Sequence, residues 1–280
     1  MTIPLDWTQA DTLGYVRFPE PGDDKYSRGV LGVLTGSEEF PGAAVLGVEG
    51  AARTGAGLIR YFGPRTPTLL VLQRRPEVVT RPGRVQAWLI GSGVPPRAER
   101  SDSSTAELRS ALAEGVPSVL DAGGLDLLAD ATGPIVITPH AGELAGLFNA
   151  GGQPRVTRNE IAADPPVWAV RAAERFGVTV LLKGHTTITA SPGGELLRVT
   201  AASSWAATAG SGDVLGGVLG ALLAGFSDEV QAGSMSLARL AAAAAHLHQS
   251  AAQAASSGGP VTALDIAEAL PGIIGGLRRE

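Results

Sequence analysis

The sequence predicts an α/β fold in which a mostly parallel central sheet is covered by helices on both faces. Two observations support this prediction. Short segments that are apolar throughout recur along the chain, which is typical of strands buried on both sides, and helical patterns alternate with them. After Lys183 the pattern changes, because two segments at 186–190 and 196–200 flank a Ser-Pro-Gly-Gly turn and predict an antiparallel hairpin.

The elements are expected in the following order. Residues 1–24 form an irregular lead-in, since they lack periodicity and are rich in turn residues, and residues 25–280 form a single domain. A buried strand is predicted at 29–35, and a helix follows from Ala43 to Thr54 behind Pro41, which suits a first helical turn. Further strands are expected at residues 58–62, 68–72, 87–90, 118–120, 135–138 and 178–182, and helices at 105–113, 142–148 and 167–176.

The C-terminal third is predicted to be helical. A glycine-rich turn leads into an apolar helix, and a long alanine-rich helix is expected from about Ser227 to Ser256. A last helix is predicted to begin near Thr262, where Asp265 three residues later approximates a capping box. No long linker divides the chain, which favours one domain.

The composition excludes several classes of protein. Hydrophobic residues make up 44% and charged residues 18% of the 280 residues, as in a globular chain. A net charge of −5 without a basic run argues against nucleic acid as a partner. Because there is no cysteine, disulfides, thiol catalysis and cysteine-bound zinc are excluded, so a metal would need oxygen or imidazole ligands, and Mg²⁺ beside phosphates would fit. Without a leader or an apolar stretch of spanning length, we expect a soluble, cytoplasmic protein that has no membrane partner.

The most informative segment is the turn from Thr208 to Gly217. Its glycines and serine precede an apolar helix, so backbone amides at the helix N-terminus are expected to attract phosphate oxygens. Gly210 and Gly212 would let a ligand approach the backbone closely. Asp213 would repel a phosphate unless a metal intervenes or its carboxylate acts as a base, which suggests phosphoryl-transfer chemistry. The alternative is an ordinary glycine-rich turn with an aspartate near a helix start.

Two glycine-rich segments lie where predicted strands end, which is where ligands bind to open parallel sheets. Gly36 and the small residues from Gly42 to Ala44 would let a ligand press on the backbone, although a tight strand-to-helix turn explains them equally well. Gly91-Ser-Gly93 follows the strand at 87–90, and Gly93 could permit a close backbone approach.

Charged side chains follow three more predicted strands. His140 stands in a Thr-Pro-His loop, and Glu143 lies in the first turn of the next helix. Lys183 directly follows an apolar strand and would suit nucleotide phosphates, or it could be a lysine whose ammonium simply reaches solvent. Asp121 could bind a hydroxyl group or a water molecule held by Mg²⁺. A pair of histidines two residues apart, His246 and His248, is interpreted as structural because the two do not share a helix face.

Together these segments resemble the ADP/ATP-dependent NAD(P)H-hydrate dehydratases, which are repair enzymes with a ribokinase-like fold. The resemblance runs in order from about Lys25 to Pro271. The family usually has proline where this chain has Ser92. The matching motifs are Gly36-Ser37, Pro41-Gly-Ala-Ala44, Arg53-Thr-Gly-Ala-Gly57, Gly91-Ser-Gly93, Leu120-Asp-Ala122, Thr138-Pro-His-Ala-Gly-Glu143, Leu182-Lys-Gly184 and Ala209-Gly-Ser-Gly-Asp-Val-Leu215.

The resemblance implies a three-layer sandwich and a set of binding residues. Ala44, Gly93, His140 and Asp213 would contact the NAD(P)H hydrate. The adenine nucleotide, ADP or ATP, would be contacted by Lys183, Gly184, His185, Thr186, Thr187, Gly210 and Gly212. Relatives often carry an epimerase domain in front, so we expect the epimerase here to be a separate protein acting on the same substrate. We also expect a homo-oligomer.

The implied reaction uses Asp213 as a base. It would accept the hydroxyl proton of the hydrate while that oxygen attacks the terminal phosphate of ADP, with amides of the turn and Mg²⁺ stabilising the phosphoryl oxygens. No side chain is predicted to bind the metal directly. Elimination of phosphate would then restore NAD(P)H and leave AMP. Two alternatives remain, namely a ribokinase-like kinase acting on a vitamin or sugar alcohol and a nucleotide-sensing module without turnover.

Overall fold

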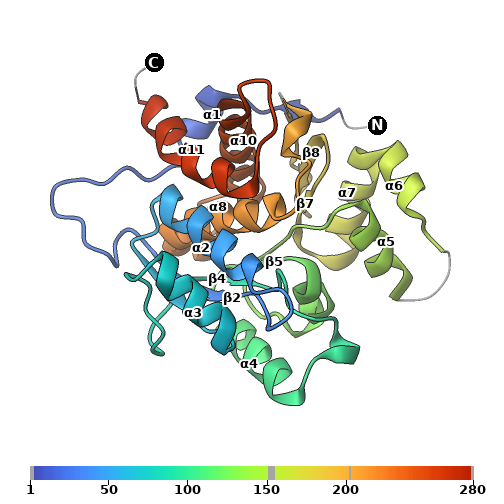
Figure 1. Cartoon of the computed structure of the whole chain (residues 1–280). Coiled ribbons are helices and arrows are strands. Elements are labelled where there is room, and N and C mark those ends of the chain that lie inside the picture. Colours follow the sequence, from blue (N-terminus) through green and yellow to red (C-terminus); the bar gives the residue numbers. More distant parts are fainter. Residues whose placement is uncertain (1–2, 151–154, 202, 279–280) are drawn as a thin grey trace.

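The computed structural model describes residues 3–150, 155–201 and 203–278. Figure 1 shows the arrangement of the elements along the chain. The strands are β1 (Leu5–Asp6), β2 (Val30–Leu34), β3 (Leu58–Tyr61), β4 (Ala87–Ile90), β5 (Ser118–Leu120), β6 (Ile135–Ile137), β7 (Thr179–Leu182), β8 (Thr186–Ala190) and β9 (Leu196–Thr200). The α-helices are α1 (Gln9–Leu13), α2 (Gly42–Thr54), α3 (Arg65–Arg74), α4 (Asp102–Ala113), α5 (Ala141–Ala150), α6 (Arg158–Ala163), α7 (Pro165–Phe176), α8 (Ser211–Gly225), α9 (Ser227–Gln231), α10 (Leu237–Ser256) and α11 (Ala263–Gly276).

The described strands form one nine-stranded sheet in the order β1-β9-β8-β7-β6-β5-β4-β2-β3. Neighbouring strands are parallel except where β8 pairs with β7 and β9, because β8 returns antiparallel in the predicted hairpin. The strands from β2 to β7 are separated by helices, as a parallel sheet requires. Their carboxyl ends consequently meet at one edge.

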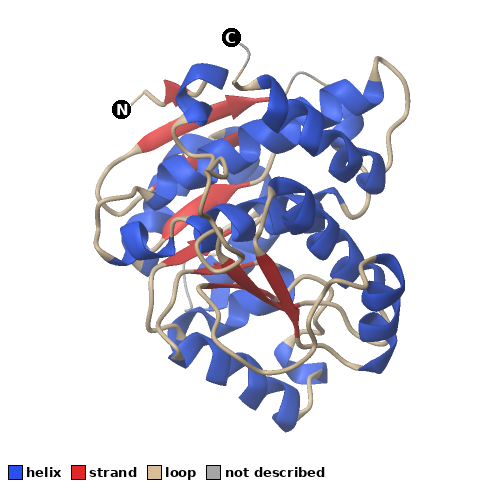
Figure 2. Ribbon diagram, turned by 90° about the vertical axis from the view of Figure 1, so that its left-hand side faces the viewer, coloured by secondary structure: helices blue, strands red, loops and turns tan. Residues whose placement is uncertain are grey.

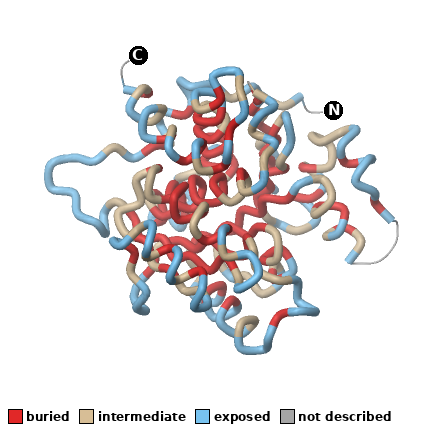
Figure 3. Tube along the Cα trace, in the orientation of Figure 1, coloured by how far each residue is buried: buried red, intermediate tan, exposed pale blue. Residues whose placement is uncertain are grey.

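Helices cover both faces of the sheet, which passes through the middle of the molecule in Figure 2. One apolar core unites the sheet with α2, α3, α8, α10 and α11, and a second unites it with α4, α5 and α7. Burial follows the same layers, since the sheet and the inner helices are buried and the peripheral loops are exposed (Figure 3). The predicted three-layer α/β fold is therefore confirmed.

Three local predictions are corrected. Residues 68–72 are helical and belong to α3, because only Val71 of this run is fully buried while Leu69 is exposed, and Pro67 is tolerated in a first helical turn. The lead-in is not wholly irregular, since β1 pairs with β9 and α1 carries a capping box. The expected helix from Ser227 to Ser256 is two helices, because Gly233 has a φ of +72° and α10 begins afresh behind Ser236.

A buried ion cluster fastens the outer helices on the α2 side. The Glu49 side chain is fully buried and accepts hydrogen bonds from Arg53, Arg74 and Arg75. Burial alone would raise the pKa of Glu49, but the arginines outweigh it and lower that pKa. Glu268 of α11 joins the cluster through Arg74 at 2.8 Å. No helix within the described ranges has the length and apolar character needed to cross a membrane.

Candidate active site

The candidate site lies at the carboxyl edge of the parallel strands. There the strands β2, β4, β5, β6 and β7 are directly followed by Thr35, Gly91, Asp121, Thr138 and Lys183. The backbone amide of Lys183 donates to the carbonyl of Pro139 at 2.8 Å, and His140 and Lys183 form an isolated parallel bridge. The strand-end motifs singled out in the sequence are thus brought together by the sheet.

The glycine turn enters α8 at this edge. Gly210 is the N-cap and has a φ of +84°, a left-handed conformation that favours glycine. The Ser211 amide donates to the Thr208 carbonyl and the Asp213 amide to that of Gly210, so not every amide of the turn is free as the sequence suggested. The backbone amides of Gly210 and Gly212 find no acceptor within the described residues. Both belong to the N-terminus of α8, where bound anions are favoured.

Asp121, Lys183, Ser92 and Thr138 form a hydrogen-bonded cluster beside this turn. The Lys183 ammonium lies 2.6 Å from Oδ1 of Asp121, and the Thr138 hydroxyl donates to the same oxygen at 2.9 Å. The Ser92 hydroxyl donates to Oδ2 of Asp121 at 2.9 Å. The buried Asp121 carboxylate is therefore satisfied by three protein donors, as a polar group in an enclosed position requires. Its role in binding a hydroxyl group or a metal-held water stays a prediction.

Asp213 is the carboxylate that remains without a counter-ion. It is half-buried in the first turn of α8 and forms no ion pair with any residue in the described part of the chain. Burial raises the pKa of Asp213 to about 6, the charge of Asp121 adds to this effect, and Lys183 and Ser92 oppose it. A carboxyl group whose pKa lies near neutral pH suits proton transfer at physiological pH.

Lys183 is held in its charged form between carboxylates. Burial alone would lower the pKa of Lys183, but Asp121 and Glu143 outweigh it and raise that pKa. The Glu143 carboxylate lies 3.8 Å from the Lys183 ammonium. A Cβ added to Gly212 would come within 3.5 Å of the same ammonium, so the lysine reaches the glycine turn, and its contact with nucleotide phosphates stays a prediction.

Ala44, Gly36 and Gly93 meet where α2 begins. A Cβ added to Gly93 would lie 2.6 Å from Cβ of Ala43 and 3.2 Å from Cα of Gly36. A Cβ added to Gly36 would lie 2.9 Å from that of Ala44. The small residues bring two loops and the start of α2 into contact, and Ala44 itself is fully buried. These contacts fit the interpretation as a tight strand-to-helix turn, and the approach of a ligand to the backbone here stays a prediction.

His140 and the predicted nucleotide-binding residues lie on the exposed side of the edge. The His140 side chain is 59% exposed, and its Nδ1 accepts the Gly142 and Glu143 amides at the start of α5. Gly184 and His185 are exposed in the turn after Lys183, whereas Thr187 is buried in β8 behind the half-buried Thr186. These assignments stay predictions, since the structure shows position and not ligand contact.

Two contacts of the site were missed in the sequence. The sequence marks Ser92 only as a serine within a glycine motif where the family usually has proline, and it does not indicate that the hydroxyl hydrogen-bonds Asp121. His248, interpreted as structural, is buried on α10 with its Nε2 3.0 Å from the Ser211 hydroxyl. Burial lowers the pKa of His248 to about 4, so this ring is neutral at pH 7 and braces the glycine turn without charge. The sequence signal for this contact is a histidine on the buried face of an alanine-rich helix, because a buried polar side chain needs a hydrogen-bond partner.

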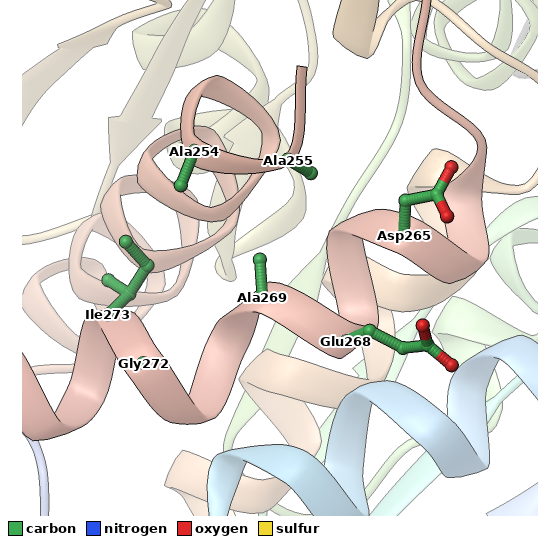
Figure 4. A pocket seen from close by; sticks show the side chains of 7 residues that line it. All are labelled: Ala254, Ala255, Asp265, Glu268, Ala269, Gly272 and Ile273. Atoms are coloured by element: carbon green, nitrogen blue, oxygen red, sulfur yellow. The ribbon is translucent and has the colours of Figure 1, made fainter. Parts of the chain in front are cut away.

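Two hollows lie away from Asp213. A hollow of about 410 Å³ lies between α10 and α11, and its lining in Figure 4 contains none of the predicted site residues. A cavity of about 790 Å³ adjoins the site through Gly36, Ser37 and Val94. Within the described ranges no three His, Asp or Glu side chains come together in a way that could hold a metal ion.

The chain matches a family model described as NAD(P)H-hydrate dehydratase over residues 31–272. It is 44% identical over 243 residues to a bifunctional NAD(P)H-hydrate repair enzyme of Mycobacterium tuberculosis, covering 79% of this chain and 48% of the relative. It is 32% identical over 215 residues to an ADP-dependent (S)-NAD(P)H-hydrate dehydratase of Neisseria meningitidis, covering 70% of this chain and 69% of the relative. The chain thus spans about half the length of the first of these relatives.

Solved structures show the same fold. An ADP/ATP-dependent NAD(P)H-hydrate dehydratase of Bacillus subtilis, co-crystallised with ATP and Mg²⁺, superposes with a TM-score of 0.82 at 24% identity over 99% of both chains. A ribokinase-like superfamily protein of Enterococcus faecalis gives a TM-score of 0.81 at 21% identity over 98% of this chain and 96% of its own. These likenesses confirm the ribokinase-like fold. With the family model covering most of the sequence, the chain belongs to the NAD(P)H-hydrate dehydratase family.

Proposed function

We propose that this chain catalyses the ADP-dependent dehydration of (6S)-NAD(P)H hydrate, giving NAD(P)H, AMP and phosphate. The observation that carries the proposal is the Asp213 carboxylate, which lies at the N-terminus of α8, lacks a counter-ion in the described part of the chain and has a pKa raised to about 6. Family membership supports the choice of substrate, and the name of the Neisseria relative supports ADP as the phosphate donor.

Asp213 begins the proposed reaction as a base. It takes the proton from the hydrate hydroxyl while that oxygen bonds to the terminal phosphorus of ADP and the bond to the AMP oxygen breaks. The free amides of Gly210 and Gly212 bind the phosphoryl oxygens on which charge develops. The phosphate ester then breaks at the ring carbon, phosphate leaves with the bonding electrons, and loss of a proton from the neighbouring carbon restores the double bond.

Lys183 and Asp121 support this step from the strand ends. Lys183 lies beside Gly212 and is fixed by its 2.6 Å contact with Asp121, so its charge is held near the position proposed for the nucleotide phosphates. Mg²⁺ is proposed only as a companion of the nucleotide. The described side chains offer no cluster that could hold it.

The test is recovery of nicotinamide absorbance from (6S)-NADH hydrate with ADP or ATP. Asp213→Asn should lower the rate roughly 10²–10⁴-fold, because a positioned base is lost while the shape is kept. Asp228→Asn is the matched control, since Asp228 also occupies the first turn of a helix but is exposed on α9. Near-wild-type turnover by Asp213→Asn would reject the role of Asp213.

Two further assays separate the alternatives when no hydrate is repaired. Phosphorylation of vitamin or sugar alcohols without hydrate repair would identify a kinase of this fold. Tight ADP binding without any product would identify a nucleotide-sensing module.

The homo-oligomer, the cytoplasmic location and cooperation with an epimerase also remain proposals. Sedimentation of the pure chain, fractionation of its source cells and assays with the (6R)-hydrate test them in turn.

A further inference from the structure

The cavity of about 790 Å³ beside the site, here called the side cavity, lies between α4 and the loops that follow β2, β3 and β4. Its volume falls within the range of about 300–1,000 Å³ that is typical of small-molecule sites. Its apolar lining includes a tilted ring pair, Phe62 and Trp88, whose ring centroids are 5.3 Å apart. A flat, uncharged ring system can pack against such a lining.

The side cavity adjoins the place proposed for the reacting ring. Gly36 lines it, and a Cβ added there would lie 2.9 Å from Cβ of Ala44 at the start of α2. A Cβ added to Gly47, also on α2, would lie 3.9 Å from the Thr35 hydroxyl and 3.7 Å from the carbonyl oxygen of Asp213. The end of β2 and the first turn of α8 therefore contact the same part of α2. A long ligand whose ring lies at Asp213 can extend its other half into the side cavity.

The side cavity is lined by four glutamates, namely Glu38, Glu99, Glu107 and Glu114. Two of them are engaged by the protein, because Glu38 accepts hydrogen bonds from Thr66 and Glu114 accepts one from the Trp88 ring nitrogen at 3.3 Å. The exposed side chains of Glu99 and Glu107 have no partner within the described ranges. These two carboxylates can accept hydrogen bonds from the hydroxyl groups of a ligand.

The side cavity offers no free cation to a phosphate group. Among its lining residues in the described part of the chain, Arg100 is the only basic one. Its side chain is 1% exposed, and its Nη2 lies 2.7 Å from Oδ2 of Asp126. In dinucleotide sites a carboxylate binds the 2′-hydroxyl of the adenosine ribose, whereas a 2′-phosphate needs an arginine. The lining therefore fits an adenosine that has a free 2′-hydroxyl group.

We propose that the side cavity binds the adenosine half of the hydrate, and that Glu99 and Glu107 make the enzyme selective for NADH hydrate over NADPH hydrate. The inference rests on the proposed function, because it places the second half of the substrate whose ring lies at Asp213. The purine packs beside Phe62, and the ribose hydroxyls donate to the two glutamates. The linking phosphates lie at the mouth of the side cavity, near the N-terminus of α2, where anions are favoured.

The selectivity follows from charge. A phosphate monoester carries up to about two negative charges at pH 7. When it lies about 6 Å from one carboxylate in water-like surroundings, the repulsion lowers its affinity about tenfold. The nicotinamide fluorescence of NADH and NADPH measures binding, with saturating ADP present to fill the adenine nucleotide site. Because these are the products, no turnover is needed. At low salt, where screening is weak, NADH should bind at least about tenfold more tightly than NADPH.

Glu99→Gln and Glu107→Gln remove the charge and keep the shape of the side chain. Each should improve NADPH binding up to about tenfold and change NADH binding less, since glutamine still accepts a hydrogen bond. The matched control is Glu174→Gln, which removes the same charge from an exposed position of α7 outside the side cavity, and it should leave the ratio of the two affinities unchanged. Equal binding of NADH and NADPH by the wild-type chain, or a ratio that neither cavity variant alters, overturns the role of the glutamates.

Two variants that fill the side cavity test its occupant. Ser110→Trp and Ser104→Trp introduce a large ring from lining positions of α4 that are exposed and half-buried, so the core is not disturbed. At least one should weaken NADH about tenfold, because the purine loses its place. Reduced nicotinamide mononucleotide lacks the adenosine half and should bind as it does to the wild type. Equal weakening of both ligands, or none in either variant, overturns the assignment of the side cavity. Binding as expected without hydrate turnover would reject the proposed function and leave the assignment standing.

Discussion

The substitution Gly217→Ala tests whether the position of Asp213 depends on backbone contact between α2 and α8. A Cβ at residue 217 would lie 2.1 Å from the carbonyl oxygen of Gly47 and 2.8 Å from the amide nitrogen of Ala51. The contact is reciprocal, since a Cβ at Gly50 would lie 2.4 Å from the Val214 carbonyl oxygen. Both obstacles are main-chain atoms of helices, which cannot rotate aside as a side chain can.

The magnitude follows from two opposing effects. Overpacking of a tight interior costs about 1–3 kcal/mol, and contacts this short with backbone belong at the upper end. Alanine in place of a helical glycine returns about 1 kcal/mol. The free energy of unfolding of Gly217→Ala should therefore fall by about 2 kcal/mol. Because α8 must move away from α2, the first turn that carries Asp213 should shift, and kcat should fall with stability.

Urea unfolding followed by circular dichroism measures the stability, and recovery of NADH from its hydrate measures kcat. The matched control is Gly146→Ala in α5, where an added Cβ meets no atom within 4 Å, so this helical glycine should gain roughly 0.5–1 kcal/mol. A Gly217→Ala protein as stable as Gly146→Ala would refute the packing argument. A destabilised protein with wild-type kcat would refute the link to Asp213.

Two further changes test the electrostatics. Glu49→Gln should lower the free energy of unfolding by about 2–3 kcal/mol at pH 7. This loss is smaller than the loss on breaking a fully buried ion pair, because the arginine side chains around Glu49 are partly exposed to water. The pKa of Glu49 is lower in the folded state than its usual 4.5, so the wild-type advantage in urea unfolding should be full above pH 4.5 and shrink as the pH falls below it. Lys183→Met removes a charge that lowers the pKa of Asp213, so the acid limb of kcat/KM should move above pH 6, and a limb that stays in place would contradict the assigned contact.

The strands and the glycine turn could be predicted because their signals are local. Buried parallel strands are apolar throughout, and Gly210 precedes a helix at a position that requires a left-handed backbone. The prediction of a strand at residues 68–72 is wrong because it rests on an equally local signal. Its apolar residues are contiguous, and only the burial of Val71 between more exposed leucines shows that the periodicity is helical.

The partners within the site could not be predicted, because they depend on the order of strands in the sheet. Asp121 and Lys183 are 62 residues apart, and they meet because β5, β6 and β7 are neighbours. The Ser92–Asp121 hydrogen bond likewise spans 29 residues across β4 and β5. Nothing in the sequence near Ser92 distinguishes a hydroxyl that hydrogen-bonds a buried carboxylate from one that completes a turn.

The structure also answers the difficulty of placing an aspartate beside a phosphate. Asp121 and Lys183 neutralise one another at 2.6 Å, which leaves Asp213 as the uncompensated charge near the free amides of the turn. With a pKa of about 6, Asp213 is mostly ionised at pH 7 and yet takes up a proton at small cost. In the proposed reaction the repulsion between Asp213 and the phosphoryl group therefore ends with the proton transfer itself. The carboxyl becomes neutral in the same step in which its substrate oxygen acquires the phosphate.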